Sequence, residues 1–100
     1  MGNAYHRHFG CPQTKDFAAE DVAGQTEQVM KNMGAILEAA GSSFSKVVKT
    51  TILLADMDDF ATVNQVYGKY FPENPPARAT FAVKGLPLGA KVEIDAVALE

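Results

Sequence analysis

Apolar residues recur at every third or fourth position in the first half of the chain, and this spacing predicts an amphipathic helix over residues 22–40. Asp21 or Glu20 places negative charge at the start of that helix, where it is favourable. Gly41 follows the last periodic position and provides the left-handed conformation that commonly ends a helix. The periodic positions are Val22, Thr26, Val29, Met30, Met33, Ile36, Leu37 and Ala40.

A strand and a second helix are predicted next. Residues 46–55 read as a strand, and Ile52-Leu53-Leu54-Ala55 is apolar on both sides, which is typical of a strand that is central in a sheet or covered by a partner. Asp58 is a candidate cap for a helix over residues 59–71, which Pro72 and the Pro75-Pro76 pair end. One face of that helix carries Phe60, Val63, Tyr67 and Tyr70 or Phe71.

Two alternating runs at the end of the chain flank a turn rich in Gly and Pro, and this pattern predicts a β-hairpin. Alternation places Arg78, Thr80 and Lys84 on one face of its first strand. If the hairpin pairs Lys84 with Lys91, Glu93 lies opposite residue 82 and Arg78 lies four residues further along, about 13 Å away. Arg78 and Glu93 are therefore expected to share a face and to flank a small ligand.

The order helix, strand, helix, strand, strand predicts an α+β fold, a small sheet with two helices packed on one face. Residues 1–15 show no sustained period and are expected to be irregular, so the folded domain is placed at residues 16–100. The uncovered sheet face is expected to be apolar enough to seek a partner. Its predicted members are Thr51, Leu53, Thr80, Ala82, Val97 and Leu99.

Composition narrows the function classes. The chain has 100 residues, enough for one domain, and its net charge of −3 argues against nucleic acid as the main partner. No apolar run reaches membrane-spanning length, so a soluble protein without a membrane partner is expected. Cys11 is the single cysteine and excludes an internal disulfide. His6 and His8 lack a third ligand nearby, so a solvated tail explains them better than a metal site.

Arg78 and Glu93 are the candidate chemical pair. An arginine holds a carboxylate through two parallel hydrogen bonds, and a nearby glutamate can position or deprotonate water. Ordinary charges on the polar face of a half-buried sheet produce the same pattern, and they are the commoner case. The residue pattern alone leaves both interpretations open.

Several segments resemble the reactive-intermediate deaminase family, also called RidA or YjgF. The C-terminal signature is carried by Pro76-Ala77-Arg78-Ala79, by Leu86-Pro87 and by Val92-Glu93-Ile94-Asp95-Ala96-Val97-Ala98. The likeness runs in one register over about residues 16–99. It includes upstream Gly24-Gln25-Thr26-Glu27-Gln28, Val47-Val48-Lys49-Thr50-Thr51, Asp59-Phe60, Val63-Asn64, Tyr67 and Tyr70-Phe71-Pro72.

The resemblance implies an α+β, chorismate-mutase-like domain that forms a homotrimer through the uncovered sheet face, with ligand sites between subunits. It implies hydrolysis of enamine and imine intermediates, such as 2-aminoacrylate and 2-iminobutyrate, to 2-keto acids and ammonia without a cofactor or metal. By position, Arg78 would bind the substrate carboxylate and Glu93 would orient or activate water. Thr80 falls where many members carry a cysteine that lines the site. A cytoplasmic location is expected, with organellar forms also known in the family.

The front of the chain departs from the family pattern, since the Gly-Pro-Tyr-Ser-like and Ser-Gly-Gln-like segments of the N-terminal strand pair do not occur. Residues 1–9 stand in their place, and the expectation is a shortened domain with reduced or absent activity. Two other functions compete with the deaminase. One is a non-catalytic ligand-binding or interaction protein, and the other is RNA cleavage, which the acidic charge and lack of a basic stripe disfavour.

Overall fold

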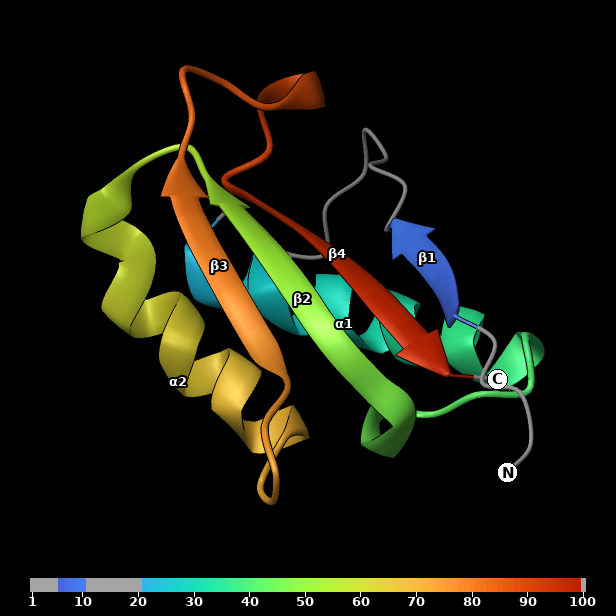
Figure 1. Cartoon of the computed structure of the whole chain (residues 1–100). Helices are drawn as coiled ribbons and strands as arrows, with labels where there is room; N and C mark the ends of the chain where they lie inside the picture. The colour runs from blue at the N-terminus through green and yellow to red at the C-terminus, as the bar shows by residue number, and fades with distance from the viewer. Residues whose placement is uncertain (1–5, 11–20, 100) are drawn as a thin grey trace.

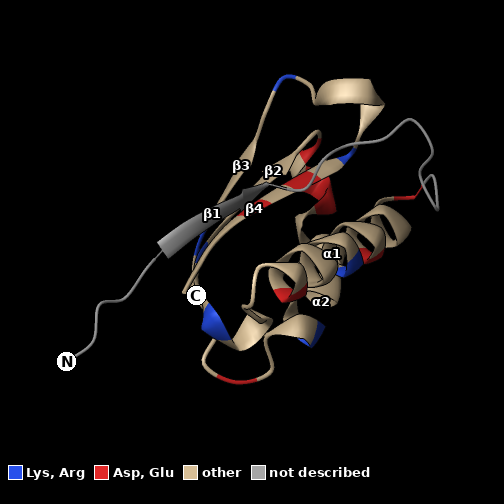
Figure 2. Cartoon of the chain, turned by 90° about the vertical axis from the view of Figure 1, so that its right-hand side faces the viewer, with Lys and Arg blue, Asp and Glu red and all other residues tan. Residues whose placement is uncertain are grey.

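Two helices cover one face of a four-stranded sheet in the computed structural model, which describes residues 6–10 and 21–99 (Figure 1). The side view in Figure 2 shows both helices on the same side of the sheet. The predicted α+β fold is confirmed. The elements are β1 (His6–Gly10), α1 (Val22–Ala39), β2 (Val47–Leu54), α2 (Phe60–Tyr70), β3 (Ala77–Ala82) and β4 (Val92–Leu99), with short 3-10 turns at Phe44–Lys46, Met57–Asp59 and Pro87–Gly89.

The strands lie in the order β1-β4-β2-β3, so the predicted hairpin of the last two strands is wrong. β2 lies between them, antiparallel to β4 and parallel to β3. A parallel pair needs a crossover connection, and α2 provides it between β2 and β3. β2 carries apolar residues on both of its faces, which is typical of a strand in the interior of a sheet, with a neighbouring strand hydrogen-bonded along each edge.

β1 corrects the expectation that residues 1–15 are irregular, because residues 6–10 pair antiparallel with β4. The register runs from His6 beside Leu99 to Gly10 beside Asp95. Such an edge strand is held by main-chain hydrogen bonds to β4 and needs no apolar alternation of its own, which is why the pattern did not reveal it. The remaining residues of that segment lie outside the described part of the chain, and the domain boundary at residue 16 stays a prediction.

The core lies between the sheet and the helices. α1 contributes Met30, Met33 and Leu37, none of which is exposed. β4 alternates strictly, with its even-numbered residues from Val92 to Ala98 buried and the intervening ones partly exposed. Burying each large apolar side chain contributes about 1.5–3 kcal/mol relative to leaving it exposed.

The helix boundaries agree with the sequence prediction to within a residue or two. Gly41 has φ +79° and provides the left-handed residue after α1. The proposed cap at Asp58 is wrong, since the carboxylate of Asp56 accepts a hydrogen bond from the Asp58 backbone N–H at 2.9 Å. Asp56 thus caps the short 3-10 turn that leads into α2, while Asp59 stands at the N-cap position of α2 itself and its side chain makes no capping hydrogen bond.

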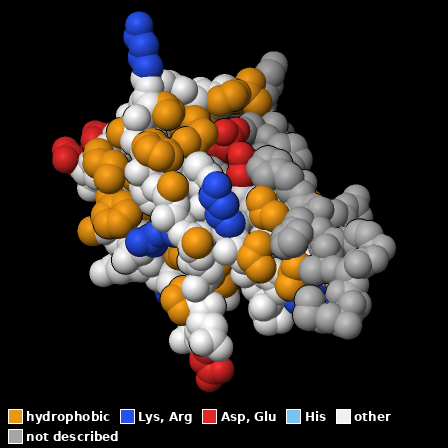
Figure 3. Space-filling model, viewed as in Figure 1, with side chains coloured by type: hydrophobic (Ala, Val, Ile, Leu, Met, Phe, Trp, Pro, Cys, Tyr) orange, Lys and Arg blue, Asp and Glu red, His pale blue; other side chains and the backbone are white. Residues whose placement is uncertain are grey.

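The other sheet face carries no helix in the described residues and is seen directly in Figure 3, where apolar side chains are mixed with charged ones. We call it the open face. Thr80 and Ala82 were expected there, but they pair with Ile52 and Leu54, which are buried toward the helices. Phe81 takes the open-face position instead and is 56% exposed. The open face includes Lys49, Thr51, Leu53, Phe81, Glu93, Asp95, Val97 and Leu99.

Candidate functional site

Arg78 lies at the second position of β3, beside Thr50 of β2, and its side chain reaches toward α2. An Nη1 hydrogen of the guanidinium is donated to Oδ1 of Asn64. The guanidinium carbon lies 5.4 Å from the ring centroid of Phe60 and 5.2 Å from that of Tyr67. Both distances are within the range of cation–π attraction, so three side chains of α2 fix the orientation of this cation.

The three side chains follow helical spacing. Phe60, Asn64 and Tyr67 occupy positions i, i+4 and i+7 of α2 and therefore form one stripe on its surface. We call them the guanidinium cradle. Because α2 is the crossover between β2 and β3, the fold brings this stripe against Arg78. Sequence reasoning had assigned Phe60 and Tyr67 to the apolar face of the helix, and the interruption of that face by Asn64 was the available signal.

A buried hydrogen bond to β2 also fixes the position of the Tyr67 side chain. Its hydroxyl shares a buried hydrogen bond of 2.7 Å with the hydroxyl of Thr50. Burial raises the pKa of the Tyr67 phenol, while the hydrogen bond from Thr50 and the positive charge of Arg78 act in the lowering direction. The phenol is therefore neutral at physiological pH. Within the described residues, Arg78 is thus held by an amide and two neutral rings, and its exposed positive charge can take an external anion.

A hollow of about 440 Å³ opens beside Arg78, where the end of α2 meets the turn into β3. Arg78 provides the charge in its lining, and the other walls are an amide, a glycine, two aromatic rings and two prolines. These residues are Asn64, Gly68, Tyr67, Phe71, Pro75 and Pro76. A cation at the edge of a recess with both polar and apolar walls suits a small carboxylate.

Glu93 is on the other side of the sheet. It pairs with Leu53, whereas Arg78 pairs with Thr50. Thr50 and Leu53 are three residues apart on one strand, so they point to opposite faces, and so do their partners. The expectation that Arg78 and Glu93 share a face is therefore wrong for a single chain, because the prediction did not place β2 between them.

Thr80 lies on the same face of β3 as Arg78 and pairs with Ile52. Its Oγ1 is buried and has no hydrogen-bond partner among the described residues. A buried hydroxyl without a partner is unusual in a folded protein. The expected role of Thr80 in substrate binding stays a prediction, as do the roles of Arg78 and Glu93.

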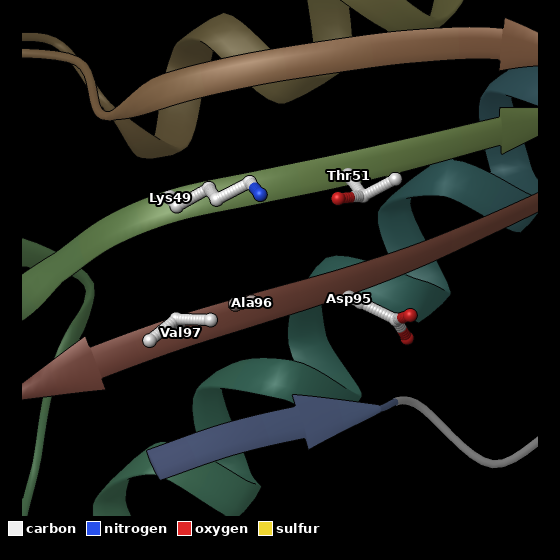
Figure 4. Close-up of a pocket in the computed structure, with 5 residues that line it drawn as sticks. All are labelled: Lys49, Thr51, Asp95, Ala96 and Val97. Carbon is white, nitrogen blue, oxygen red and sulfur yellow. The ribbon is translucent and has the colours of Figure 1, made fainter. Parts of the chain in front are cut away.

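A second hollow, of about 90 Å³, lies on the open face and was missed by sequence reasoning (Figure 4). Lys49 and Thr51 of β2 stand opposite Val97 and Asp95 of β4, and all four side chains point the same way from the sheet. The hollow is too small for more than a few water molecules. Alternation in the sequence predicts which face of its strand each residue occupies. It does not predict that these four residues lie next to one another, because that depends on the register between β2 and β4.

Over residues 6–10 and 21–99, no three His, Cys, Asp or Glu residues gather into a possible metal site. Neither described helix combines the length and apolar character needed to cross a bilayer.

Comparison with known proteins places the chain in a family. A family model described as Endoribonuclease L-PSP matches residues 8–100. The chloroplastic Reactive Intermediate Deaminase A of Arabidopsis thaliana is 59% identical over 87 residues, which are 87% of this chain and 46% of that protein. The chain belongs to the reactive-intermediate deaminase family.

Other members of the deaminase family agree in sequence and in structure. The human 2-iminobutanoate/2-iminopropanoate deaminase is 51% identical over 89 residues, 89% of this chain and 65% of that protein. The crystal structure of RidA from a Psychrobacter species superposes with a TM-score of 0.79 at 43% identity, covering 82% of this chain and 67% of that one. The chain thus spans about half to two thirds of the length of these relatives.

Proposed function

We propose that this protein hydrolyses reactive 2-imino acids and their enamine tautomers to 2-keto acids and ammonia. The observation that carries the proposal is the exposed Arg78 guanidinium, fixed by the cradle on α2 beside a hollow of small-molecule size. The substrate carboxylate accepts hydrogen bonds from two of the remaining guanidinium N–H groups, which sets the position of the imine carbon. The deaminase names of the human and Arabidopsis relatives support the same reaction class.

The chemical step needs little beyond positioning. Water adds to the imine carbon, so a C–O bond forms and the imine nitrogen gains a proton. Glu93 accepts one proton of the attacking water and passes it to the imine nitrogen, which gives the carbinolamine. Glu93 then accepts the hydroxyl proton of the carbinolamine and passes it to the amino group; the C–N bond breaks, ammonia leaves with the bonding electron pair, and the carbonyl forms.

The proposed site is shared between copies of the chain. Arg78 and Glu93 lie on opposite faces of one sheet, so a site that uses both takes Glu93 from a neighbouring copy. The open face supports association, because Leu53 is partly exposed there and Phe81 is 56% exposed. We propose a homotrimer that packs through this face and contains three equivalent sites.

The first test is turnover with altered Arg78. A pyridoxal-phosphate dehydratase releases 2-iminobutyrate from threonine, and the rate of 2-ketobutyrate formation is followed with and without the protein. Arg78→Ala removes the charge and the fork, so we expect kcat/KM to fall about 10- to 100-fold or more. Arg78→Lys keeps the charge without the fork and should retain an intermediate rate. Unchanged turnover in Arg78→Ala would remove this residue from the mechanism.

A second candidate is a binding protein without catalysis. The observation in its favour is that the carboxylate anchor is complete within one chain, whereas Glu93 is not near it. Binding of 2-ketobutyrate by the wild-type protein without any acceleration of imine hydrolysis would favour this function. Because the family description names an endoribonuclease, the same preparation is also tested on single-stranded RNA; the net charge of −3 leads us to expect no cleavage.

A further inference from the structure

A groove in the helix layer, on the opposite side of the sheet from the open face, takes no part in the proposed reaction (Figure 2). It is lined by α1, by the segment that joins α1 to β2 and by Tyr70 at the end of α2, and its volume is about 580 Å³. The rings of Phe44 and Tyr70 are half-buried in its walls, with centroids 5.3 Å apart. The groove therefore leaves aromatic surface in contact with solvent, which favours a partner.

Gly34 sets the depth of this groove. It lies within α1, where glycine is less favourable than alanine. A Cβ at this position would come within 3.0 Å of the Phe44 ring, so the lack of a side chain lets that ring lie directly against the helix. Phe44 also packs edge-on against Phe71 at 5.5 Å, which ties the groove to the core. The groove is therefore held in shape by packing within one chain.

A ridge of three exposed residues on α1 borders the groove. Lys31, Ala35 and Glu38 lie at positions i, i+4 and i+7, so they follow one another along the same side of the helix. The ridge is low at its centre, where Ala35 adjoins Gly34, and it carries opposite charges at its two ends. In the described part of the chain, neither Lys31 nor Glu38 has an ion-pair partner. Both charges are therefore available to a neighbouring molecule.

The two charges have the arrangement that two copies of the chain need in order to bind each other with two-fold symmetry. When two α1 helices cross antiparallel about the midpoint between Gly34 and Ala35, Lys31 of each copy lies opposite Glu38 of the other. The smallest residues then meet at the crossing point, where they allow a close approach of the helices. The ridge of each copy faces the groove of the other, as in the ridge-into-groove packing of helix pairs.

We propose that this groove is a contact surface between two copies of the chain, joined by reciprocal ion pairs between Lys31 and Glu38. A second copy is the occupant because one ridge and groove contain both halves of the complementary charge pattern. Exposed ion pairs each contribute little, so the contact is weak and sensitive to salt. It lies apart from Arg78 and from the open face, so it is independent of the proposed function and can join one proposed trimer to another.

Charge reversal tests the contact, with the mass of the protein measured by sedimentation from about 10 µM to about 1 mM. Toward the upper end of this range, wild-type protein should form a species of at least twice the mass seen at the lower end. Lys31→Glu places glutamates opposite each other and Glu38→Lys does the same with lysines, so each variant alone should associate at least about tenfold more weakly.

A mixture of these two variants provides the decisive arm. Each copy of one variant then meets opposite charges on the other, so the mixture should associate about as strongly as wild type. The double variant Lys31→Glu/Glu38→Lys exchanges the two charges and should also associate with itself. A ridge that acts only within its own chain would show neither recovery.

Lys69→Glu is the matched control, because it reverses an exposed charge on α2 that does not line the groove and should leave the association unchanged. Circular dichroism checks that every variant is folded. The inference is overturned if wild-type protein keeps the mass of Lys31→Glu at every concentration, which would assign the groove to another partner. It is equally overturned if either single variant associates as strongly as wild type, or if the mixture of the two folded variants does not associate.

Discussion

Mixing two inactive variants provides the sharpest test of a site shared between copies. Arg78→Ala lacks the carboxylate anchor, and Glu93→Gln lacks the proposed base while keeping its size. Each variant alone should lose most of its turnover, about 10²–10⁴-fold for loss of a general base. Since the two residues lie on opposite faces of the sheet, a copy of each variant can supply what the other lacks.

The expected recovery follows from the geometry. In a ring of three, each site takes Arg78 from one copy and Glu93 from the next. The two variants are present in equal amounts and exchange at random. A site is complete only when a Glu93→Gln copy supplies Arg78 and the next copy in the ring is Arg78→Ala, which supplies Glu93. That combination occurs at about a quarter of the sites, so the mixture should show about a quarter of wild-type turnover.

The assay is the coupled release of 2-ketobutyrate after the two variants have been unfolded together and refolded. Mixing without unfolding serves as the control for slow exchange. A second mixture pairs wild-type chains with the double variant, and it should also retain about a quarter of the activity, whereas a site within one chain would retain about half. The reasoning is refuted if the first mixture stays inactive while the second retains half.

Two further predictions concern stability and assembly. Tyr67→Phe leaves the hydroxyl of Thr50 without its buried partner and should lower the free energy of unfolding by about 1–3 kcal/mol in urea titrations. Because burial raises the pKa of Tyr67 in the folded protein, this group stabilises the fold fully below about pH 10 and less above it. The free energy of unfolding should therefore fall between about pH 8 and pH 11, and it should fall less in Tyr67→Phe than in wild type. Leu53→Asp places a charge on the open face and should convert the proposed trimer to single chains, measured as a lower mass in light scattering. The control is Ala61→Asp at an exposed position of α2, which should leave the mass unchanged. A trimer that survives Leu53→Asp would contradict association through the open face.

The helices could be predicted because their signals are local. The spacing from Val22 to Ala40 and the left-handed Gly41 give α1 almost to the residue. The strand order depends on pairing between distant segments, which no local pattern reports. Alternation in β3 and β4 with a turn between them is what a hairpin would show, yet β2 separates the two strands.

The sequence nevertheless indicated that β2 lies inside the sheet. Ile52 and Leu54 face the helices, while Leu53 is half-buried on the open face, which marks β2 as an interior strand. An interior strand needs two neighbours, and β3 and β4 supply them. That requirement does not say which strands are the neighbours, so it left the relative position of Arg78 and Glu93 open. The hairpin prediction was wrong because it paired the two strands within residues 77–99 directly through the short turn between them, whereas β2 lies between these strands.

The sequence singled out Arg78 as a candidate site residue but not the side chains that surround it. Arg78 stood out by position and resemblance, but its cradle depends on a crossover helix that packs onto a parallel strand. Asn64 gave a weak signal as a polar residue beside an apolar stripe. The hollow lined by Gly68 could not be predicted, because empty space depends on the relative placement of α2 and the Pro75-Pro76 turn.

The cradle has a consequence for how the protein can change over time. Arg78 and the three side chains that hold it all come from residues 60–78, a continuous piece of chain. The proposed carboxylate site is thus encoded by one continuous segment, while Glu93 lies on another strand and faces the opposite way. Substitutions on the open face can alter or abolish the chemistry and leave this site intact. Descendants of such a chain could exchange one reaction for another, or keep only the capacity to capture small acids, without rebuilding the part that recognises them.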